Sequence, residues 1–489
     1  MGVSMFFRML YDDKLAQASY IIGCQATGEA LVIDPERDVD RYIRFVQNEG
    51  MRIVAITETH IHADFLSGMR ELAEKTGARI YVSDEGDADW KYQWLDKKQG
   101  GGSYDYRLLR DGDTFKIGNI RVQAIHTPGH TPEHLCFLVT DFGGGATEPI
   151  GMATGDFVFV GDVGRPDLLE TAAGQQGAKE PSARTLFRSL QRFKELPDFL
   201  QIWPGHGAGS ACGKALGAVP QSTVGYEKRF NPALAFENED DFVRFILQGQ
   251  PEPPPYFARM KKENKEGPAL LGELPKPQRL DVATLFQLVE QNAVIVDTRD
   301  WEAFRAGHLP GSLYAPLTPS FPSIVGSYIE PRESIYLIVD DHRVREAVTD
   351  LIRIGLDRVV GYAPPEILLE FQSQGGQLVQ TPSMDIETLQ HQPLPENTVL
   401  LDVRNISEFQ QGHLPGATNI AYTRLVPRGR ELPGGKNVWV YCRTNNRSAA
   451  AAAYLERLGF NVTHLAGGIL SWQLSRGELV SESEENTAV

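Results

Sequence analysis

The sequence contains no long hydrophobic run. Among its 489 residues, no stretch approaches the ~18 consecutive apolar residues that a membrane-spanning helix needs. The apolar patch near the N-terminus is soon interrupted by charged residues and has no small-residue cleavage site, so it is not a good signal peptide. These absences predict a cytoplasmic protein without a membrane partner.

Cysteine is scarce as well. Cys24, Cys136, Cys212 and Cys442 are far apart and form no CxxC pair. This spacing argues against a disulfide framework and against a structural zinc site. Cys24 and Cys136 lie in apolar, strand-like segments, and we expect both to be buried.

Positive charge is in deficit. Lys and Arg number 48 against 64 Asp and Glu, which gives a formal net charge of −16. Such a surface repels phosphate backbones and anionic lipids, so nucleic acids and membranes are poor partners. A small anionic substrate remains possible where a metal ion or an arginine receives it.

The length suggests roughly three domains of about 150 residues. In the first 250 residues, strand-like runs such as RIVAITET alternate with Gly-rich turns, and FLSGMRELAEKTG predicts a helix that ends at Gly77. An internal repeat begins later, because eight of the fifteen positions from Asp297 to Gly311 recur 105 residues further on. We divide the chain into a first domain (1–250), a proline-rich linker (251–280), two repeat domains (281–378 and 384–479) and an acidic tail (480–489).

Both copies of the repeat have the same predicted order. An amphipathic helix (DVATLFQLVEQN or DIETLQHQ) precedes an apolar strand (AVIVD or NTVLLD), and a second strand (IYLIV or VWVYC) precedes another helix. Strands that alternate with helices predict a mostly parallel α/β sheet. The fold class is therefore α/β and multidomain.

Histidines and carboxylates gather in four short motifs of the first domain. THIHAD (59–64) directly follows a predicted strand, and HTPGHTPEH (126–134), TGD (154–156) and PGH (204–206) come later. The i, i+2, i+4 spacing at a strand end places ligand-type side chains where the chain leaves the sheet. Imidazole and carboxylate groups suit zinc or iron. The four motifs together predict a metal centre.

These motifs, with Arg165 nine residues after Asp156, resemble the metallo-β-lactamase superfamily, and its glyoxalase II and persulfide dioxygenase branches in particular. The resemblance implies an αββα sandwich with the metal at one edge. It also implies that His60, His130 and Asp156 hold one Fe(II) per chain, with zinc as the alternative metal.

Phe65 departs from the pattern of the dinuclear hydrolases. These enzymes carry THxHxDH, whose final histidine binds a second metal, whereas phenylalanine cannot ligate. A mononuclear iron site with open positions for a sulfur substrate and O2 needs no ligand there. The resemblance then places His62, Asp64 and His206 around the metal ligands, where they orient water or substrate.

Two ligand assignments stay open. Asp162, which ends the strand-like run FVFVG, is an alternative carboxylate, although the spacing to Arg165 favours Asp156. On composition alone, His126 or His134 is as suitable as His130. The family pattern PGHT points to His130, and we expect structural or hydrogen-bonding roles for the other two.

Three further residues are candidates for the substrate side. Arg165 and Asp167 resemble the substrate-side loop of the dioxygenases, where Arg165 either binds a substrate anion or forms a structural salt bridge. Cys212 either carries a persulfide near the metal or packs in the core. The segment GAGSACGKALG after His206 lacks the Asp-Tyr pair of glutathione-using relatives, so we expect coenzyme A or another low-molecular-weight thiol as the persulfide carrier.

Cys442 lies in a second candidate site. The segment CRTNNRS follows the predicted strand VWVY and precedes an Ala-rich helix. Backbone N–H groups and the helix N-terminus stabilise an anion in such a loop. Arg443 and Arg447 add positive charge, which favours a nucleophilic thiolate.

This loop, with DVR, GHLPGA and HLAGGILSW, resembles the rhodanese sulfurtransferases. The resemblance implies that Cys442 carries a persulfide sulfur in the short loop that ends at Arg447. Asn445 stands where relatives often have glycine, and because asparagine tolerates positive φ we expect the loop to close. In the middle copy Asp340 and Arg345 take the places of Cys442 and Arg447, and a carboxylate cannot form a persulfide.

The domain order resembles bacterial fusions of a persulfide dioxygenase with an inactive and an active rhodanese domain. The resemblance implies an enzyme of sulfide detoxification that oxidises a thiol persulfide with O2 to sulfite. Its Cys442 would transfer sulfane sulfur between persulfide, sulfite and thiosulfate. The alternatives are a zinc-dependent thioester hydrolase of glyoxalase II type with an accessory sulfurtransferase domain, and a non-catalytic persulfide carrier. Acidic multidomain enzymes are often homo-oligomers, and we expect the same here.

Overall fold

The computed structural model describes residues 5–172, 174–435 and 437–481. The chain forms two compact units. The first contains the residues up to Glu273 and the short segment Ile352–Gly355, and the second contains Leu274–Leu351 and the residues from Leu356 onward. Most of the predicted acidic tail, from 482 onward, lies outside the described residues. Within the described ranges, no helix has the length and apolarity that crossing a bilayer requires.

The first unit is built on two six-stranded sheets. In one sheet the strands lie in chain order, and in the other they lie in the order β12-β11-β10-β9-β8-β7. The first sheet contains β1 (Met5–Asp12), β2 (Gln17–Cys24), β3 (Glu29–Ile33), β4 (Arg52–Thr57), β5 (Arg79–Ser83) and β6 (Tyr106–Leu109). The second contains β7 (Thr114–Ile117), β8 (Ile120–His126), β9 (Leu135–Asp141), β10 (Gly151–Gly155), β11 (Gln201–Pro204) and β12 (Ser222–Thr223).

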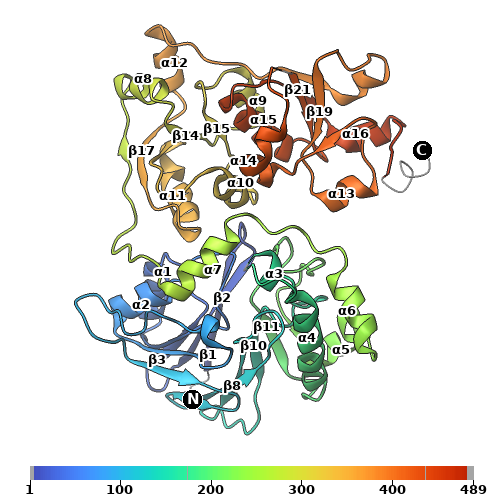
Figure 1. The fold of residues 1–489 in the computed structure, drawn as a ribbon. Coiled ribbons are helices and arrows are strands. Elements are labelled where there is room, and N and C mark those ends of the chain that lie inside the picture. The colour runs from blue at the N-terminus through green and yellow to red at the C-terminus, as the bar shows by residue number, and fades with distance from the viewer. Residues whose placement is uncertain (1–4, 173, 436, 482–489) are drawn as a thin grey trace. The chain divides into compact units, whose positions relative to one another are not determined.

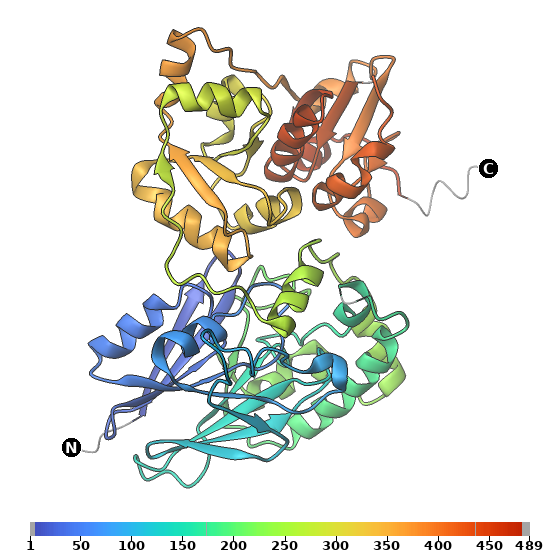
Figure 2. The ribbon, with the colours of Figure 1, turned by 60° about the vertical axis from the view of Figure 1, so that its left-hand side comes forward.

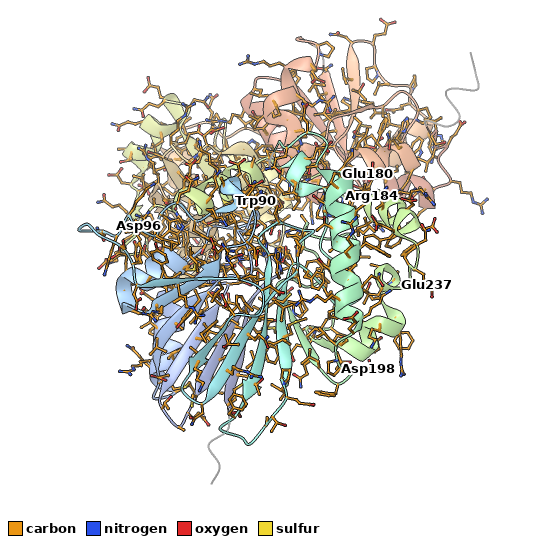
Figure 3. The ribbon with its side chains drawn as sticks, turned by 60° about the horizontal axis from the view of Figure 1, so that its bottom comes forward. Trp90, Asp96, Glu180, Arg184, Asp198 and Glu237 are labelled. Carbon is orange, nitrogen blue, oxygen red and sulfur yellow. The ribbon has the colours of Figure 1, made fainter. Side chains whose placement is uncertain are left out.

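Helices cover the outer faces of the two sheets, so that the unit has four layers (Figure 1). On one side lie α1 (Asp40–Asn48), α2 (Met69–Thr76) and α7 (Phe257–Glu266), and on the other α3 (Leu168–Thr171), α4 (Lys179–Lys194), α5 (Val224–Phe230) and α6 (Glu239–Leu247). The predicted αββα sandwich is confirmed. Figure 3 shows Glu180 and Arg184 on the outer side of α4, where they form an ion pair of 2.8 Å.

The strand β2 shows why the first sheet is buried on both faces. Its alternating side chains serve two cores: Tyr20 and Ile22 pack between the sheets, while Ile21 packs beneath the helices. Alternation of this kind follows from the two-residue period of a strand. The predicted helix after Leu66 is confirmed as α2, which ends at Gly77 in the left-handed conformation (φ 67°).

The second unit contains two five-stranded sheets of the same strand order, each with helices on its faces (Figure 2). All of its paired strands are parallel, which confirms the predicted parallel α/β architecture. The first repeat module consists of β13 (Gln278–Arg279), β14 (Val294–Asp297), β15 (Leu313–Tyr314), β16 (Ile335–Ile338), β17 (Val359–Ala363), α8 (Val282–Glu290), α9 (Trp301–Ala306), α10 (Phe321–Tyr328), α11 (Val344–Arg353) and α12 (Ile367–Ser373). The second repeat module consists of β18 (Ser383–Asp385), β19 (Thr398–Asp402), β20 (Thr418–Asn419), β21 (Asn437–Tyr441), β22 (Asn461–Ala466), α13 (Ile406–Gln411), α14 (Leu425–Arg428), α15 (Asn446–Arg457) and α16 (Gly468–Leu474).

Two local predictions are wrong. The segment DIETLQHQ forms a short 3-10 helix (Ile386–Gln390) in place of an amphipathic α-helix, because few of its side chains reach the core and only Ile386 is buried. The run FVFVG is not a strand; it is a loop closed by a single bridge between Val158 and Val163. Phe157, Val158 and Val163 of this loop are buried in the core around α4, so their hydrophobicity reflects tertiary packing.

Candidate functional site

Four loops at one edge of the sandwich carry the candidate metal ligands. They follow β4, connect β8 to β9, follow β10 and follow β11. Strand ends at a common edge bring together side chains that are far apart in the chain. Glycines permit the close approach of these loops. A Cβ at Gly164 would lie 1.7 Å from the carbonyl oxygen of Asp156, and one at Gly205 would lie 2.8 Å from Asp156 Oδ1.

His60, His130 and Asp156 converge, with ligand-type atoms within 4.8 Å of one another. The Nε2 atoms of His60 and His130 lie 3.8 and 3.5 Å from Asp156 Oδ2. Their Nδ1 atoms are engaged elsewhere, by Thr59 Oγ1 at 2.9 Å and by the Arg165 carbonyl at 2.9 Å. Both imidazoles therefore turn Nε2 towards the carboxylate.

The carboxylate of Asp156 has the features of a metal ligand. The side chain is fully buried, and neither oxygen accepts a hydrogen bond from a nitrogen or a hydroxyl of the described residues. Burial alone would raise its pKa, but the adjacent imidazoles of His206 and His130 lower it below the ordinary value, so the group stays charged. A buried, unsatisfied carboxylate facing two imidazole nitrogens fits a divalent cation.

Asp64, His206 and Cys212 form a second buried group beside the first. His206 Nε2 lies 3.2 Å from Asp64 Oδ2 and 3.4 Å from Asp156 Oδ1, so it links the two groups. Its Nδ1 is 3.0 Å from the Ala16 carbonyl. Burial raises the pKa of the Cys212 thiol well above its usual range, and the two carboxylates add to this effect. Cys212 is therefore a neutral thiol unless a cation lies beside it.

Cys442 directly follows β21, and α15 begins four residues later. Its side chain is 1% exposed, and Sγ lies 3.3 Å from the hydroxyl of Ser448. Arg447 forms a bidentate pair with Glu408 of α13, at 2.6 and 2.9 Å. Arg443 is on the exposed side of the loop. The structure thus places one arginine in a fixed ion pair and leaves the other facing solvent.

The Cys442 loop closes in a different way from the one we predicted. Asn445 has a φ of −141°, so it does not use the left-handed region. Its side-chain oxygen accepts a hydrogen bond from the backbone N–H of Gly467 at 3.0 Å. The neighbouring Gly468 passes so close that a Cβ there would lie 2.5 Å from the Cys442 carbonyl oxygen. The amide of Asn445, rather than its backbone freedom, holds the loop.

Comparison with known proteins identifies the family. Residues 12–206 match the metallo-beta-lactamase superfamily, and residues 281–363 and 387–475 match the rhodanese-like domain. The crystal structure of a metallo-beta-lactamase from Staphylococcus aureus subsp. aureus COL is 42% identical, with 75% of this chain and 100% of that chain covered and a TM-score of 0.66. The chain belongs to the metallo-β-lactamase superfamily. In it, a metallo-β-lactamase domain precedes two rhodanese-like modules.

Curated relatives of the metallo-β-lactamase domain carry different names. A beta-lactamase hydrolase-like protein of Agrobacterium fabrum is 30% identical over 258 residues, which are 48% of this chain and 54% of the relative. The mitochondrial persulfide dioxygenase ETHE1 of Bos taurus is 27% identical over 288 residues, which are 58% of this chain and 87% of the relative. The chain spans about half the length of the beta-lactamase hydrolase-like proteins that it matches.

Arg165 and Asp167 of the metallo-β-lactamase domain bind each other. Their bidentate pair measures 2.8 and 2.6 Å, and a third guanidinium nitrogen donates to the Ala211 carbonyl at 3.0 Å. Arg165 is 1% exposed. These contacts are those of the salt-bridge alternative, and they tie the loop after β10 to the loop of Cys212. The substrate-binding role of the two residues stays a prediction.

The alternative ligands Asp162, His126 and His134 make other contacts than the group of His60, His130 and Asp156. Asp162 accepts backbone hydrogen bonds from Lys214 and Ala215, both at 2.8 Å, and does not face the two histidines. His134 Nε2 accepts from the Asp156 N–H at 3.1 Å, and His126 Nε2 lies 2.8 Å from the Pro132 carbonyl. The expected hydrogen-bonding roles of His126 and His134 are confirmed, as is the burial of Cys24 and Cys136.

His62 and Phe65 complete the loop after β4. His62 Nε2 lies 3.0 Å from Asp34 Oδ1, and although burial opposes a charge, Asp34 raises the pKa of His62 to about 10. The buried ring of Phe65 lies 4.4 Å from the ring of His62. An apolar side chain therefore stands where a dinuclear hydrolase has a ligand.

Sequence reasoning missed three residues that shape this loop. Asp34, directly after β3, accepts from Thr59 N–H at 2.7 Å, and Glu133 accepts from Ile61 N–H at 2.7 Å. The side chain of Asn264 in α7 donates to the carbonyls of His62 (2.9 Å) and Phe65 (2.8 Å). The position of Asp34 directly after a strand is a usable signal. Asn264 has none, because it lies about two hundred residues away in a segment with the composition of a linker.

In the first repeat module, the sheet register places Val339, and not the predicted Asp340, at the position equivalent to Cys442. Asp297 and Asp402, which are equivalent in the repeat, pair with Ile338 and Tyr441, and Val339 and Cys442 are the next residues. Asp340 lies one residue further on, at the start of the turn Asp341–Arg343 that leads into α11. Because sulfur transfer needs a thiolate, this module has no nucleophile at the equivalent place.

Proposed function

We propose that the protein is a persulfide dioxygenase joined to a thiosulfate sulfurtransferase. At the first site, RSSH + O2 + H2O gives RSH + SO3²⁻ + 2 H⁺; the outer sulfur loses four electrons and O2 accepts them. The observation that carries the proposal is the buried group of His60, His130 and Asp156, whose carboxylate is unsatisfied, on a chain that also holds the Cys442 loop. The name of the Bos taurus relative supports the same activity.

Each residue of the first site has a distinct task. His60, His130 and Asp156 would hold Fe(II), which supplies activation of O2 beside the substrate sulfur. Thr59 and the Arg165 carbonyl fix the tautomers of the two histidines, so that Nε2 is free to bind. His206, held at Nδ1 by the Ala16 carbonyl, would exchange a proton with substrate or water at Nε2.

A cavity of about 280 Å³ that reaches His206 would give the substrate its approach. Met9, Tyr11, Ala18 and Pro204 are among the side chains that line it, so most of the wall is apolar. An apolar wall with one phenol suits the organic part of a low-molecular-weight thiol. We propose that the thiol group enters along this wall and presents its outer sulfur beside Asp156.

Cys442 would carry out the second reaction. Its thiolate attacks the outer sulfur of a persulfide, so that Cys442–S⁻ + RSSH gives Cys442–SS⁻ + RSH. Sulfite then attacks that sulfur, and Cys442–SS⁻ + SO3²⁻ gives Cys442–S⁻ + S2O3²⁻; the reverse direction is equally balanced. The first site produces the sulfite that the second consumes, and one chain that carries both raises the local concentration of the shared intermediate.

The test is O2 consumption by the anaerobically iron-loaded full chain, with sulfite and thiosulfate quantified. Glutathione, coenzyme A and other low-molecular-weight persulfides are compared. We expect His60→Ala to abolish O2 uptake, and Cys442→Ser to keep uptake but accumulate sulfite in place of thiosulfate. His391→Ala, on the surface of the second repeat module, is the matched control. No uptake with any persulfide would reject the dioxygenase.

One observation favours a second candidate, a zinc-dependent hydrolase. Asp64, His206 and Cys212 stand beside the first group as a second set of ligand-type atoms. A dinuclear zinc site of this kind would use Cys212 where other hydrolases use the histidine replaced by Phe65. Thioester cleavage that depends on two zinc ions per chain, without O2 uptake, would support the hydrolase.

A further inference from the structure

A hydrogen-bonded series of side chains leads from Cys442 into the second repeat module. Ser448 Oγ lies 3.3 Å from Cys442 Sγ and 2.9 Å from His464 Nε2. On the far side of the ring, His464 Nδ1 lies 3.2 Å from Ser383 Oγ. Ser448 and His464 have no exposed surface, so bulk water does not compete for these bonds.

The single hydroxyl proton of Ser448 has three acceptors within reach. They are Cys442 Sγ, His464 Nε2 and the Asn445 carbonyl at 3.0 Å. If His464 carries its proton on Nδ1, then Nε2 competes for the hydroxyl proton. If the ring proton is on Nε2, that nitrogen donates to Ser448, and the hydroxyl is free to donate to sulfur.

We propose that Ser448 and His464 are positioning residues for sulfur transfer, which direct one hydroxyl proton at the anionic sulfur of Cys442. The three hydrogen bonds then run in one direction. The Ser383 hydroxyl donates to His464 Nδ1, the His464 Nε2–H donates to Ser448 Oγ, and the Ser448 hydroxyl donates to Cys442 Sγ. Bonds aligned in this way polarise one another, and a donor to an anion is stronger than one to a neutral group. The inference rests on the proposed sulfurtransferase function and deepens it.

His464 is suited to this task because its ring is neutral. Burial lowers the pKa of His464 to about 4 against the opposing effect of a hydrogen bond to the Asn445 backbone; Arg305 lowers it further and Glu302 raises it. Arg305 and Glu302 belong to α9 of the first repeat module and pair with each other. A neutral ring has one N–H, so its tautomer decides where the Ser448 proton points.

The first repeat module has no thiol at the position equivalent to Cys442, but one of its side chains packs against His464. The indole of Trp301 in α9 lies 4.9 Å from the ring of His464 at 62°. The same module holds the far end of α15, the helix that carries Ser448. His308 Nε2 lies 3.2 Å from Glu456 Oε2, and Arg457 donates to the Gly311 carbonyl at 2.7 Å. We therefore assign Trp301 a part in holding His464 in place.

The experiment measures two properties of Cys442 in the full chain. Iodoacetamide alkylation of the Cys442 peptide is followed by mass spectrometry from pH 5 to 10, and Cys442 persulfide is followed after addition of glutathione persulfide. The variants are Ser448→Ala, His464→Leu, His464→Gln, Trp301→Ala and Trp301→Phe. Ser475→Ala, at the half-buried C-terminal end of α16, and His391→Gln, at an exposed position, are the controls in the same module.

We expect Ser448→Ala to slow alkylation at pH 7 about tenfold and to raise the midpoint of the pH–rate profile by about one pH unit, since a hydrogen bond to a charged group is lost. His464→Leu shifts the midpoint in the same direction. His464→Gln restores most of the rate, because its amide N–H replaces the Nε2 donor. Trp301→Ala has a smaller effect, and Trp301→Phe stays near the wild type.

The outcomes separate the two proposals. Profiles of Ser448→Ala and His464→Leu that coincide with that of the wild type, while wild-type Cys442 takes up persulfide, overturn the positioning role alone. Wild-type protein that never forms Cys442 persulfide overturns the sulfurtransferase function itself. A reduced alkylation plateau in His464→Leu with an unshifted midpoint, and no rescue by His464→Gln, indicates a packing defect and also rejects the positioning role.

Discussion

At the scale of single residues, Asp156 has the environment of a metal ligand. It is fully buried, faces two imidazole nitrogens, and receives no hydrogen bond from a nitrogen or hydroxyl among the described residues. A buried carboxylate without a hydrogen-bond donor is unfavourable. A cation at this position would remove that penalty, so metal affinity is expected to depend on this carboxylate.

We expect Asp156→Asn to lower the affinity for the bound metal about 100-fold or more, because even residues that support a ligand contribute about 10–100-fold. Metal content per chain, measured by mass spectrometry after dialysis, checks this. Asp162→Asn is the comparison, since Asp162 is the other carboxylate of that region and bonds to backbone N–H groups. Metal loss in Asp162→Asn but not in Asp156→Asn would reassign the ligand.

The buried pair of Arg165 and Asp167 is expected to matter for stability. Asp167→Asn leaves a guanidinium that is 1% exposed without its partner, and breaking a buried pair in this way costs about 3–5 kcal/mol. Calorimetric unfolding of the first unit measures the loss. Asp198→Asn breaks an exposed pair with Lys228 and should leave the transition unchanged. Equal effects of the two variants would contradict a structural role of Arg165.

The pKa of His464 predicts how the stability of the second unit depends on pH. Burial lowers the pKa of His464 to about 4, whereas the unfolded chain protonates histidine near 6.5. Between these values the unfolded state binds more protons, so this contribution to stability is lost as pH falls from about 6.5 to about 4. His464→Gln should lack this loss, which reaches about 1.4 kcal/mol per pH unit at most. Melting temperatures measured across pH, beside those of His391→Gln, check the difference.

At the scale of elements, α7 links a distant part of the chain to the candidate metal loop. Its Asn264 accepts from Ser67 N–H at 2.9 Å and donates to the carbonyls of His62 and Phe65. Its neighbours Phe257 and Met260 are buried. The loop after β4 is therefore held by a helix that sequence composition assigns to a linker.

Removing this support should weaken the metal site without touching a ligand. Asn264→Ala leaves the Ser67 N–H and two carbonyl groups without their buried partner, and we expect metal affinity to fall about 10–100-fold. Lys262→Ala, at an exposed position of the same helix, is the matched control. Binding isotherms for Fe(II) or Zn(II) under anaerobic conditions provide the measurement, and equal affinities of both variants would refute the role of α7.

At the scale of the whole molecule, each compact unit has hydrophobic cores of its own. The first unit contains one core between its sheets and one beneath each helical layer. The second unit has a separate core in each repeat module. Units with independent cores can unfold in separate steps.

We expect calorimetry to show at least two transitions. Added metal should raise the melting temperature of the first unit's transition, by a stabilisation of about 2.7 kcal/mol at a free concentration 100 times the dissociation constant. The transition of the second unit should stay in place, because its described residues contain no comparable group of metal ligands. Assignment uses Asp167→Asn, which should shift only the first. A metal-dependent shift of both transitions would contradict the separation.

The sequence by itself determined the architecture and predicted the residues of both candidate sites. Periodic apolar runs predict strands and helices because each element must bury one face, and the repeat reveals two modules because identical positions recur at a constant offset. The motifs around His60, His130, Asp156 and Cys442 are local, so they can be read from neighbouring residues. The strand predicted for FVFVG and the helix predicted for DIETLQHQ are wrong for the same reason, because a local pattern does not show which tertiary contacts a segment makes.

Only the tertiary structure decided which side chains meet. Asn264 supports a loop about two hundred residues earlier in the chain, Arg165 binds its neighbour Asp167 rather than facing open space, and Trp301 packs on His464 from another module. The closure of the Cys442 loop by Asn445 and Gly467 is of the same kind. These contacts depend on the directions of side chains from separate elements, and no residue type or spacing along the chain encodes such a direction.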